Sequence, residues 1–410
     1  MGPGQRRVLL LLVAVISVNA SYTVLIPFVP DLEERVGAGP VTIAAMFALF
    51  AAAKALVQPL GGWWVDRWRA SGVACVALNI AAVGIVVTAF AQDSATLLLG
   101  RVCWGVGEGL VTPALYAGMA ALCQRYELST SRMMGNFGSA AVAGFLLGPL
   151  ITGIAAPLGL GTLFLAGAVA TSLTAFGLLR AIPDVPAGTP AADSTPADPA
   201  TPDGPSIGRR WWILVLALGG LDLFTHLVYS ALEPLLPLYV STAADASARG
   251  AISVVFVVGL ATSALSMWAL GRYTERFSLV TLINTGLALL AAGLVGMSAS
   301  PAVLPVASSF VLFMVGYAML FLSARRGIVE LRSSVGNHGK AFGLFGLVSD
   351  IGNVLGPVVG VLLYELTGSL SFVILGVLSG LLMAALLVAA GRRRVSRDAG
   401  ESRSPHLVRV

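Results

Sequence analysis

The sequence predicts an all-α membrane protein with twelve transmembrane helices, arranged as two pseudo-symmetric six-helix bundles. Three observations support this fold class: an apolar composition, twelve apolar runs of membrane-spanning length, and an internal repeat. Of the 410 residues, 57% are hydrophobic and only 11% are charged, and the mean hydropathy is +0.88. Soluble domains carry about 25% charged residues, so the composition excludes an ordinary soluble protein.

The apolar runs divide the chain into two sets of six. A helix needs about 20 apolar residues to cross the hydrocarbon core of a bilayer. Residues 181–210 are rich in Pro, Ala and Asp and lack periodicity, which predicts a disordered linker between a bundle at 1–180 and a bundle at 211–392. Residues 393–410 are expected to form a basic tail. The expected helices are 8–30, 41–62, 72–92, 96–121, 135–156, 160–180, 211–240, 248–270, 279–298, 303–324, 341–364 and 369–391.

Basic residues fall unevenly on the two sides of the predicted membrane. All but four of the 25 Lys and Arg residues lie on the side that also holds both termini. The positive-inside rule assigns this side to the cytoplasm, so we expect a multi-pass protein of the plasma membrane with both termini cytoplasmic. The net charge of +5 therefore reports topology and does not indicate a nucleic-acid partner. The four exceptions are Arg35, Lys54, Arg101 and Arg249.

Three short patterns each occur twice. A Tyr-x4-Pro-x2-Pro pattern, a Gly-x3-acid-Arg pattern and a Gly-x8-Gly-x3-Gly-Pro pattern recur after 207 to 209 residues, at the same place in each half. A common offset indicates duplication, which is typical of secondary transporters, whose substrate site lies between the repeats near mid-membrane. The first copies begin at Tyr22, Gly62 and Gly135, and the second at Tyr229, Gly271 and Gly343.

The segment GGWWVDRWR at 61–69 is similar to the cytoplasmic signature of the major facilitator superfamily. The resemblance implies that Asp66 caps or pairs with a helix of the other half and so locks the outward-facing state. A simpler interpretation is that Arg67 and its repeat counterpart only fix the topology. The gating residues that this signature and its second copy predict are Gly62, Asp66, Arg67, Gly271, Glu275 and Arg276.

The repeated Gly-Pro pattern resembles the antiporter signature of twelve-helix drug:proton antiporters within that superfamily. Gly144 and Gly148 are one helical turn apart and open a groove for a neighbouring backbone, while Pro149 bends the helix. The resemblance implies that this bend packs the two halves together and favours exchange over uniport. Ordinary small-residue packing explains the glycines equally well. The second copy contains Gly352, Gly356 and Pro357.

Further segments extend the resemblance. RVCWGVG at 101–107 is similar to the superfamily's helix-4 signature, with Trp104 where Gln is usual. LFAAAKALVQP at 49–59 and ALEPLLPLYV at 231–240 are similar to the vesicular amine transporters, and the second segment contains Glu233. The resemblance implies a transporter that carries small molecules and uses an ion gradient.

Two pairs of charges lie inside predicted helices, where each charge costs about 2.5–3.5 kcal/mol and is expected to have a partner. Lys54 and Asp350 lie at equal depths, so we expect an ion pair between the two halves, or else two independent cavity-lining charges. Arg101 and Glu108 share a helix face and are expected to form a cavity-facing pair. The alternative is that Arg101 extends to the outer interface.

The segment LDLFTHLVYSALEPLLP at 221–237 carries a polar stripe on one helix face, because its polar residues are spaced by 4, 3 and 4. An acid in an apolar cavity can bind a proton on one side of the membrane and release it on the other. Alternatively, Asp222 and His226 satisfy each other as a buried polar pair. The proton-coupling and cavity residues predicted here are Asp222, His226, Tyr229 and Glu233, with Asn19 and Tyr22 on the equivalent helix of the first half.

These observations predict a proton-coupled exporter of a small lipophilic or cationic compound. It would act as a monomer in the bilayer, with protons and a small molecule as its partners and without a cofactor or a metal. No ATP-binding loop and no nucleophile constellation occur in the sequence, so we do not expect an enzyme. The alternatives are a proton-coupled importer or facilitator of a metabolite and, more distantly, a membrane sensor that transports nothing.

Overall fold

The computed structural model describes residues 3–128, 130–183, 209–243, 248–273, 276–332 and 338–401. Most of these residues are helical and none of them forms a β-strand, which confirms the predicted all-α fold. Linker residues 184–208, tail residues 402–410 and Glu275 lie outside the described residues. The first half forms α1 (Pro3–Val24), η1 (Ile26–Phe28), α2 (Val29–Val36), α3 (Pro40–Arg67), α4 (Ala70–Phe90), α5 (Ser94–Arg125), α6 (Thr130–Ala155), η2 (Ala156–Leu158) and α7 (Gly159–Ala181). The second half forms α8 (Arg209–Ser241), α9 (Ala248–Tyr273), α10 (Leu279–Met297), α11 (Val303–Arg332), α12 (His338–Thr367) and α13 (Leu370–Glu401).

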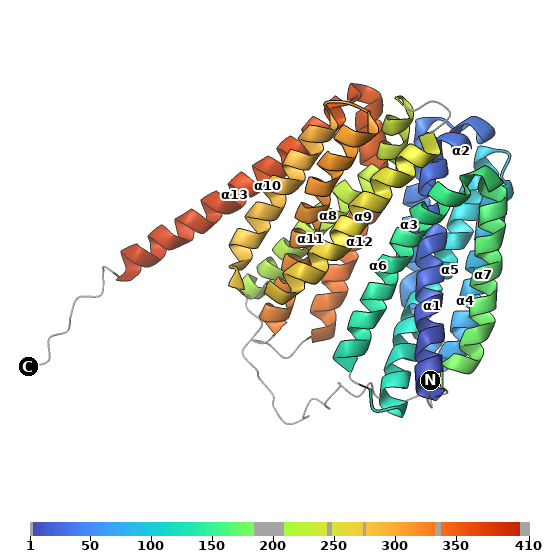
Figure 1. Cartoon of the computed structure of the whole chain (residues 1–410). Coiled ribbons are helices and arrows are strands. Elements are labelled where there is room, and N and C mark those ends of the chain that lie inside the picture. Colours follow the sequence, from blue (N-terminus) through green and yellow to red (C-terminus); the bar gives the residue numbers. More distant parts are fainter. Residues whose placement is uncertain are drawn as a thin grey trace, which may run out of the picture.

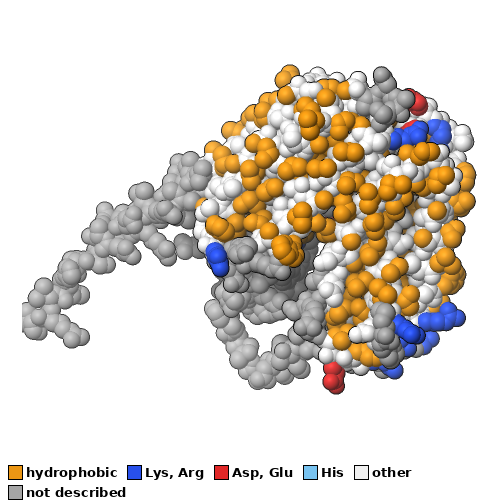
Figure 2. Space-filling view, in the orientation of Figure 1, with side chains coloured by type: hydrophobic (Ala, Val, Ile, Leu, Met, Phe, Trp, Pro, Cys, Tyr) orange, Lys and Arg blue, Asp and Glu red, His pale blue; other side chains and the backbone are white. Residues whose placement is uncertain are grey.

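The helices have the length and hydropathy of membrane spans. Ten segments of the described chain are long and apolar enough to cross a membrane, and Leu370–Leu386 is a shorter apolar segment. One of the ten, Asn136–Ala181, contains most of α6 and all of α7. Figure 2 shows apolar side chains over the middle of the visible face, with the coloured charged side chains near its two ends. The chain is therefore a multi-pass membrane protein.

The two halves form bundles with the same internal arrangement (Figure 1). In the first bundle, α1 packs against α6, α5 packs against α3 and α4, and α4 packs against α7. In the second bundle, α8 packs against α12, α11 packs against α9 and α10, and α10 packs against α13. The neighbours correspond helix by helix, as a duplicated chain requires.

The repeated proline patterns have different consequences in the two bundles. Pro27 lies in η1, the 3-10 turn that separates α1 from α2, whereas Pro234 and Pro237 lie inside the continuous helix α8. Proline removes a backbone donor, so it bends a helix or ends it according to the packing around it. The prolines of the Gly-Pro pattern, Pro149 and Pro357, lie inside α6 and α12.

The bundles meet along α3 with α12 and along α6 with α9. We call the end of the molecule at which α1 begins the proximal end, and the opposite end the distal end. An apolar core at the distal end includes Phe28 of the first bundle together with Leu236 and Tyr239 of the second. Asp31 of α2 pairs with Arg249 of α9, whose Nε lies 2.9 Å from both carboxylate oxygens. These contacts close the distal end.

The proximal part of the first bundle has a core of its own. This core contains Leu11, Val73, Leu115 and Leu178, and every one of its described members belongs to the first bundle. Figure 2 shows the molecule hollowed between its two halves toward the proximal end. The bundles therefore touch at the distal end and separate toward the proximal end.

The glycines of the repeated Gly-Pro patterns allow close packing inside each bundle. A Cβ added to Gly148 would lie 2.7 Å from the backbone nitrogen of Val24 in α1, and Gly144 also faces α1. Gly352 and Gly356 of α12 face α8 in the same way. These glycines therefore pack α6 and α12 within their own bundles. Because α6 also contacts α9 of the other bundle, the expectation that this segment packs the two halves together stays a prediction.

We predict that Gly148→Val lowers the free energy of unfolding by about 1–3 kcal/mol, because a side chain there forces α6 away from α1. Thermal unfolding of the purified protein in detergent measures the effect. The matched control is Gly138→Val in the same helix, where an added Cβ meets nothing within 4 Å. Equal losses of stability in the two variants would contradict the packing role.

Candidate functional site

The predicted polar stripe lies in α8 and points into the protein. Asp222 is fully buried and Glu233 is 6% exposed, so neither carboxylate faces lipid. His226 and Tyr229 are partly buried. An ionisable group held away from water needs a partner inside the protein, so the contacts of each residue indicate its role.

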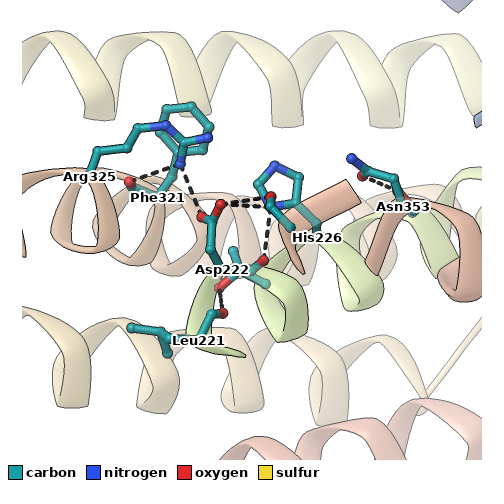
Figure 3. A network of polar contacts seen from close by, with 9 residues as sticks. Leu221, Asp222, His226, Phe321, Arg325 and Asn353 are labelled. Atoms are coloured by element: carbon teal, nitrogen blue, oxygen red, sulfur yellow. Dashed lines mark hydrogen bonds and ion pairs between the residues drawn. The ribbon is translucent and has the colours of Figure 1, made fainter. Parts of the chain in front are cut away.

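Asp222 is the centre of a network that joins α8, α11 and α12 (Figure 3). Arg325 of α11 donates from Nη1 to Asp222 Oδ1 at 3.0 Å, and Ser349 of α12 donates from Oγ to Asp222 Oδ2 at 2.7 Å. His226 Nδ1 lies 3.6 Å from Asp222 Oδ2 and 2.8 Å from the Asp222 carbonyl oxygen. Both carboxylate oxygens of Asp222 therefore have a hydrogen-bond donor.

Arg325 is a site residue that the sequence analysis missed. The predicted helix ended at residue 324, so Arg325 counted as a topology charge, whereas α11 continues to Arg332. The guanidinium carbon lies 3.3 Å from the centre of the Phe321 ring, one turn away on the same helix. The sequence did contain a signal for this residue: Phe321 and Arg325, an aromatic and a basic residue at the end of the apolar run, are four positions apart.

Glu233 contacts the other bundle directly. The Tyr22 hydroxyl of α1 donates to Glu233 Oε2 at 2.7 Å, so this hydrogen bond crosses from the first bundle to the second. The ring of Tyr22 lies 4.9 Å from that of Phe50 and 6.4 Å from that of Phe145, measured between centroids. The structure thus brings together two predicted site residues that are 211 positions apart in the chain.

Arg101 is fully buried, which excludes the alternative that it reaches the outer interface. Its Nε donates to the Met46 carbonyl at 3.0 Å, while Nη1 and Nη2 make no hydrogen bond to a described residue. The guanidinium carbon lies 4.3 Å from the ring centre of Phe50, 4.8 Å from that of Trp104 and 5.4 Å from that of Tyr22. Aromatic faces stabilise a cation in this position.

Lys54 pairs with Glu108. Lys54 Nζ lies 3.0 Å from Glu108 Oε2, so Glu108 is the partner of Lys54 and not of Arg101. The predicted pairs Lys54–Asp350 and Arg101–Glu108 are therefore wrong for this state of the molecule. The equal-depth argument gave the depth of Lys54 in the membrane but not the direction of its side chain. That side chain reaches Glu108 because α5 packs against α3 within the same bundle. Glu108 Oε1 is buried and has no hydrogen-bond partner among the described residues.

The remaining two predicted cavity residues have local contacts. Asn19 donates from Nδ2 to the Val15 carbonyl of its own helix at 2.8 Å, and it packs beside Gly144. The ring of Tyr229 lies 5.0 Å from the ring of Tyr317 in α11, measured between centroids. Asn19 therefore belongs to the packing between α1 and α6, and Tyr229 belongs to an aromatic surface of the second bundle.

The predicted gating residues lie at the proximal ends of α3 and α9. A Cβ added to Gly62 would meet nothing within 4 Å, and the Arg67 guanidinium carbon lies 4.1 Å from the ring centre of Trp63. In the described part of the chain, Asp66 makes no hydrogen bond or ion pair, so its role as a lock stays a prediction for a state closed at the proximal end. Gly271 lies near the end of α9 and Arg276 follows it, exposed.

The chemistry available at this site is proton and cation binding. Within the described residues, no group of three or more His, Cys, Asp and Glu side chains is placed to hold a metal ion. The site instead combines carboxylates, a buried guanidinium and aromatic rings at the seam of two bundles.

Comparisons of sequence place the chain among transporters. The sequence profile of the Major Facilitator Superfamily matches residues 11–324 and 223–409. The quinolone resistance protein NorA of Staphylococcus aureus (strain MSSA476) is 22% identical over 344 residues, covering 83% of this chain and 85% of that protein. Multidrug resistance protein 1 of Bacillus subtilis (strain 168) is 22% identical over 354 residues, with the same coverage.

Solved structures share the fold. The nucleoside transporter NupG superposes with a TM-score of 0.74 at 12% identity, covering 95% of this chain and 99% of that one. A bacterial homologue of the human lysosomal transporter Spinster, in an inward-facing and occupied conformation, superposes with a TM-score of 0.72 at 17% identity, covering 96% and 98%. With the profile match and the duplicated bundles, these comparisons show that the chain is a membrane transporter belonging to the Major Facilitator Superfamily.

Proposed function

We propose that the protein exports small lipophilic or cationic compounds in exchange for external protons, by alternating access. The observation that carries this proposal is the hydrogen bond between Tyr22 and Glu233. It places a buried carboxylate at the seam of the two bundles, with a neutral phenol as its hydrogen-bond donor. A carboxylate held in this way can accept either a proton or a substrate cation, and its surroundings change when the bundles move.

The balance of charge supports exchange. Among the described residues, Asp222 and Glu108 each have a lysine or arginine within ion-pair distance, whereas Glu233 has none. Asp222 has Arg325, and Glu108 has Lys54. A surplus negative charge in an apolar interior requires a proton or a bound cation.

Aromatic rings on both sides of Glu233 suit a lipophilic cation. Tyr22 and its neighbouring rings belong to the first bundle, and Tyr229 belongs to the second. The ring of Tyr317 lies 5.9 Å from that of Phe321, which extends this aromatic surface along α11. Aromatic faces bind organic cations through their negative quadrupole and bury flat apolar groups.

The relatives support the direction of transport. NorA is named for quinolone resistance and the Bacillus protein for multidrug resistance, which are phenotypes of export. By the positive-inside rule, the excess of Lys and Arg supports a proposed orientation in the plasma membrane with the proximal end in the cytoplasm. In that orientation the hollow between the bundles opens toward the cytoplasm, where an exporter collects its substrate.

We predict that Glu233→Gln abolishes proton-driven export. Everted membrane vesicles with an acid lumen are expected to accumulate ethidium, representing lipophilic cations, when they contain the wild type. The variant is expected to fall to the level of vesicles without the protein, because glutamine binds neither a proton nor a cation. A protonophore should abolish the wild-type signal.

The matched control for this measurement is Glu34→Gln, because Glu34 is exposed in α2, away from the network. Wild-type accumulation in the Glu233→Gln vesicles would refute the assignment of this carboxylate. Expulsion of ethidium driven by the acid lumen would support the importer instead.

We predict that Asp222 contributes to stability as well as to the site. Asp222→Asn leaves the Arg325 guanidinium without a charged partner and should lower the free energy of unfolding by about 1–3 kcal/mol. Ser349→Ala removes one neutral donor from the same carboxylate and should cost about 0.5–1.5 kcal/mol. Thermal unfolding in detergent compares the two variants, and a smaller loss for Asp222→Asn would contradict the anchoring role of Asp222.

A further inference from the structure

Arg101 carries hydrogen-bond donors that the described part of the protein does not use. Its side chain is fully buried in α5, and its Nε atom bonds to the Met46 carbonyl at 3.0 Å. The Nη1 and Nη2 atoms are buried and have no hydrogen-bond partner within the described chain. Because a buried charged donor without an acceptor lowers stability, a ligand that supplies an acceptor here gains an interaction that the fold leaves unmade.

The neighbours of Arg101 stabilise its charge but do not bond to Nη1 and Nη2. Aromatic faces attract a cation through their quadrupole, and they offer no strong hydrogen-bond acceptor. Glu108, the carboxylate on the same helix, is bonded to Lys54 instead. The guanidinium carbon of Arg101 lies within 5.6 Å of the ring centres of four residues, Tyr22, Phe47, Phe50 and Trp104.

Tyr22 adjoins both Arg101 and the carboxylate of Glu233. Its hydroxyl donates to Glu233 Oε2 at 2.7 Å, and its ring centre lies 5.4 Å from the guanidinium carbon. The phenol oxygen interacts with the guanidinium as well, but without the geometry of a hydrogen bond. Glu233 and Arg101 also act on each other electrostatically. One side chain therefore separates a carboxylate from an unused pair of cationic donors.

A ligand with both an ammonium group and a carboxylate matches this arrangement. It brings no net charge into the bilayer interior, where an unpaired ion is strongly unfavourable. A carboxylate can bond to two guanidinium nitrogens at once, because the guanidinium presents its donors as a planar fork. The aromatic rings around Arg101 suit a flat apolar body between the two charged groups.

We propose that Nη1 and Nη2 of Arg101 bind the carboxylate of aromatic zwitterionic substrates whose ammonium group binds Glu233. This inference rests on the proposed function, because it takes Glu233 as the cation-binding group. An ammonium group that binds Glu233 displaces the Tyr22 hydroxyl, and rotation of the Tyr22 side chain then opens Arg101 to the carboxylate. The site therefore prefers an aromatic zwitterion to a cation of the same shape.

Rhodamine B and its ethyl ester test this preference, because the two dyes share one aromatic cation. Rhodamine B has a free carboxylate, whereas esterification removes that negative charge. Fluorescence polarisation of each dye with the purified protein in detergent gives the two dissociation constants. The wild type is expected to bind rhodamine B about tenfold more tightly than the ester, because the carboxylate gains charge-assisted hydrogen bonds.

Two variants should remove the preference without removing binding of the ester. Arg101→Gln lacks the guanidinium and should weaken rhodamine B to within about twofold of the ester. Arg101→Lys keeps a cation among the rings but lacks the planar fork, so it should lose most of the preference and decides the test if Arg101→Gln does not fold. Binding of the ester at wild-type strength shows that a variant is folded.

Equal binding of the two dyes by the wild type would overturn the proposal and identify buried water as the acceptor for Arg101. A wild-type preference for rhodamine B in either folded Arg101 variant would also overturn it. Glu34→Gln, exposed in α2, is the neutral control and should bind both dyes as the wild type does.

Glu233→Gln separates this inference from the proposed function. It should weaken both dyes by a similar factor, because both carry the cation. If it leaves both dyes bound at wild-type strength while the Arg101 variants lose the preference, the carboxylate site at Arg101 stands and the proposed role of Glu233 fails. If it weakens both dyes while the Arg101 variants keep the preference, the role of Glu233 stands and the Arg101 site is rejected.

Discussion

The structure depends on one constraint: an ionised group inside a bilayer must find its partner within the protein. The two ion-paired carboxylates, Asp222 and Glu108, are each bonded from other helices. Asp222 of α8 is bonded from α11 and α12, and Glu108 of α5 is bonded from α3. These partners come from separate helices. The hydrogen bonds and ion pairs that they make therefore also fix how the helices are arranged around the seam.

The duplication supplies two bundles of equal architecture, but the charges are not duplicated with it. Of the charged residues at the site, Lys54, Arg101 and Glu108 belong to the first bundle, and Asp222, Glu233, Asp350 and Arg325 belong to the second. Opposite excess charge on the two sides draws the bundles together wherever they approach. Under the proposed exchange, a proton or a cationic substrate would alter that attraction locally and so link occupancy of the site to the tilt of the bundles.

Much of the fold follows from periodicity and repetition, because helix length and hydropathy are local properties of the chain. Each of the twelve expected segments overlaps an observed helix, although ten segments of the described chain, and a shorter one at Leu370–Leu386, account for its apolar spans. The polar stripe of α8 was recognisable from its spacing. Partner choice was not predictable in this way. Depth along a helix does not specify the direction of a side chain, so Lys54 was assigned to Asp350. Arg325 was missed because α11 continues to Arg332, beyond its apolar run.

An apolar core and the Asp31–Arg249 pair close the distal end. The site can therefore be accessible from the proximal end and closed to the distal end. Apolar contacts are strong only at close range, so the distal seam is either packed or open and has few intermediate positions. The Tyr22–Glu233 hydrogen bond lies across this seam and exists only while the bundles are in contact at that level. Opening the distal end must therefore break it, and at that moment Glu233 loses its donor from the first bundle. In the proposed exchange, a carboxylate whose only hydrogen-bond donor among the described residues is removed by the conformational change becomes available to a new ligand in each cycle, which is the condition that coupling requires.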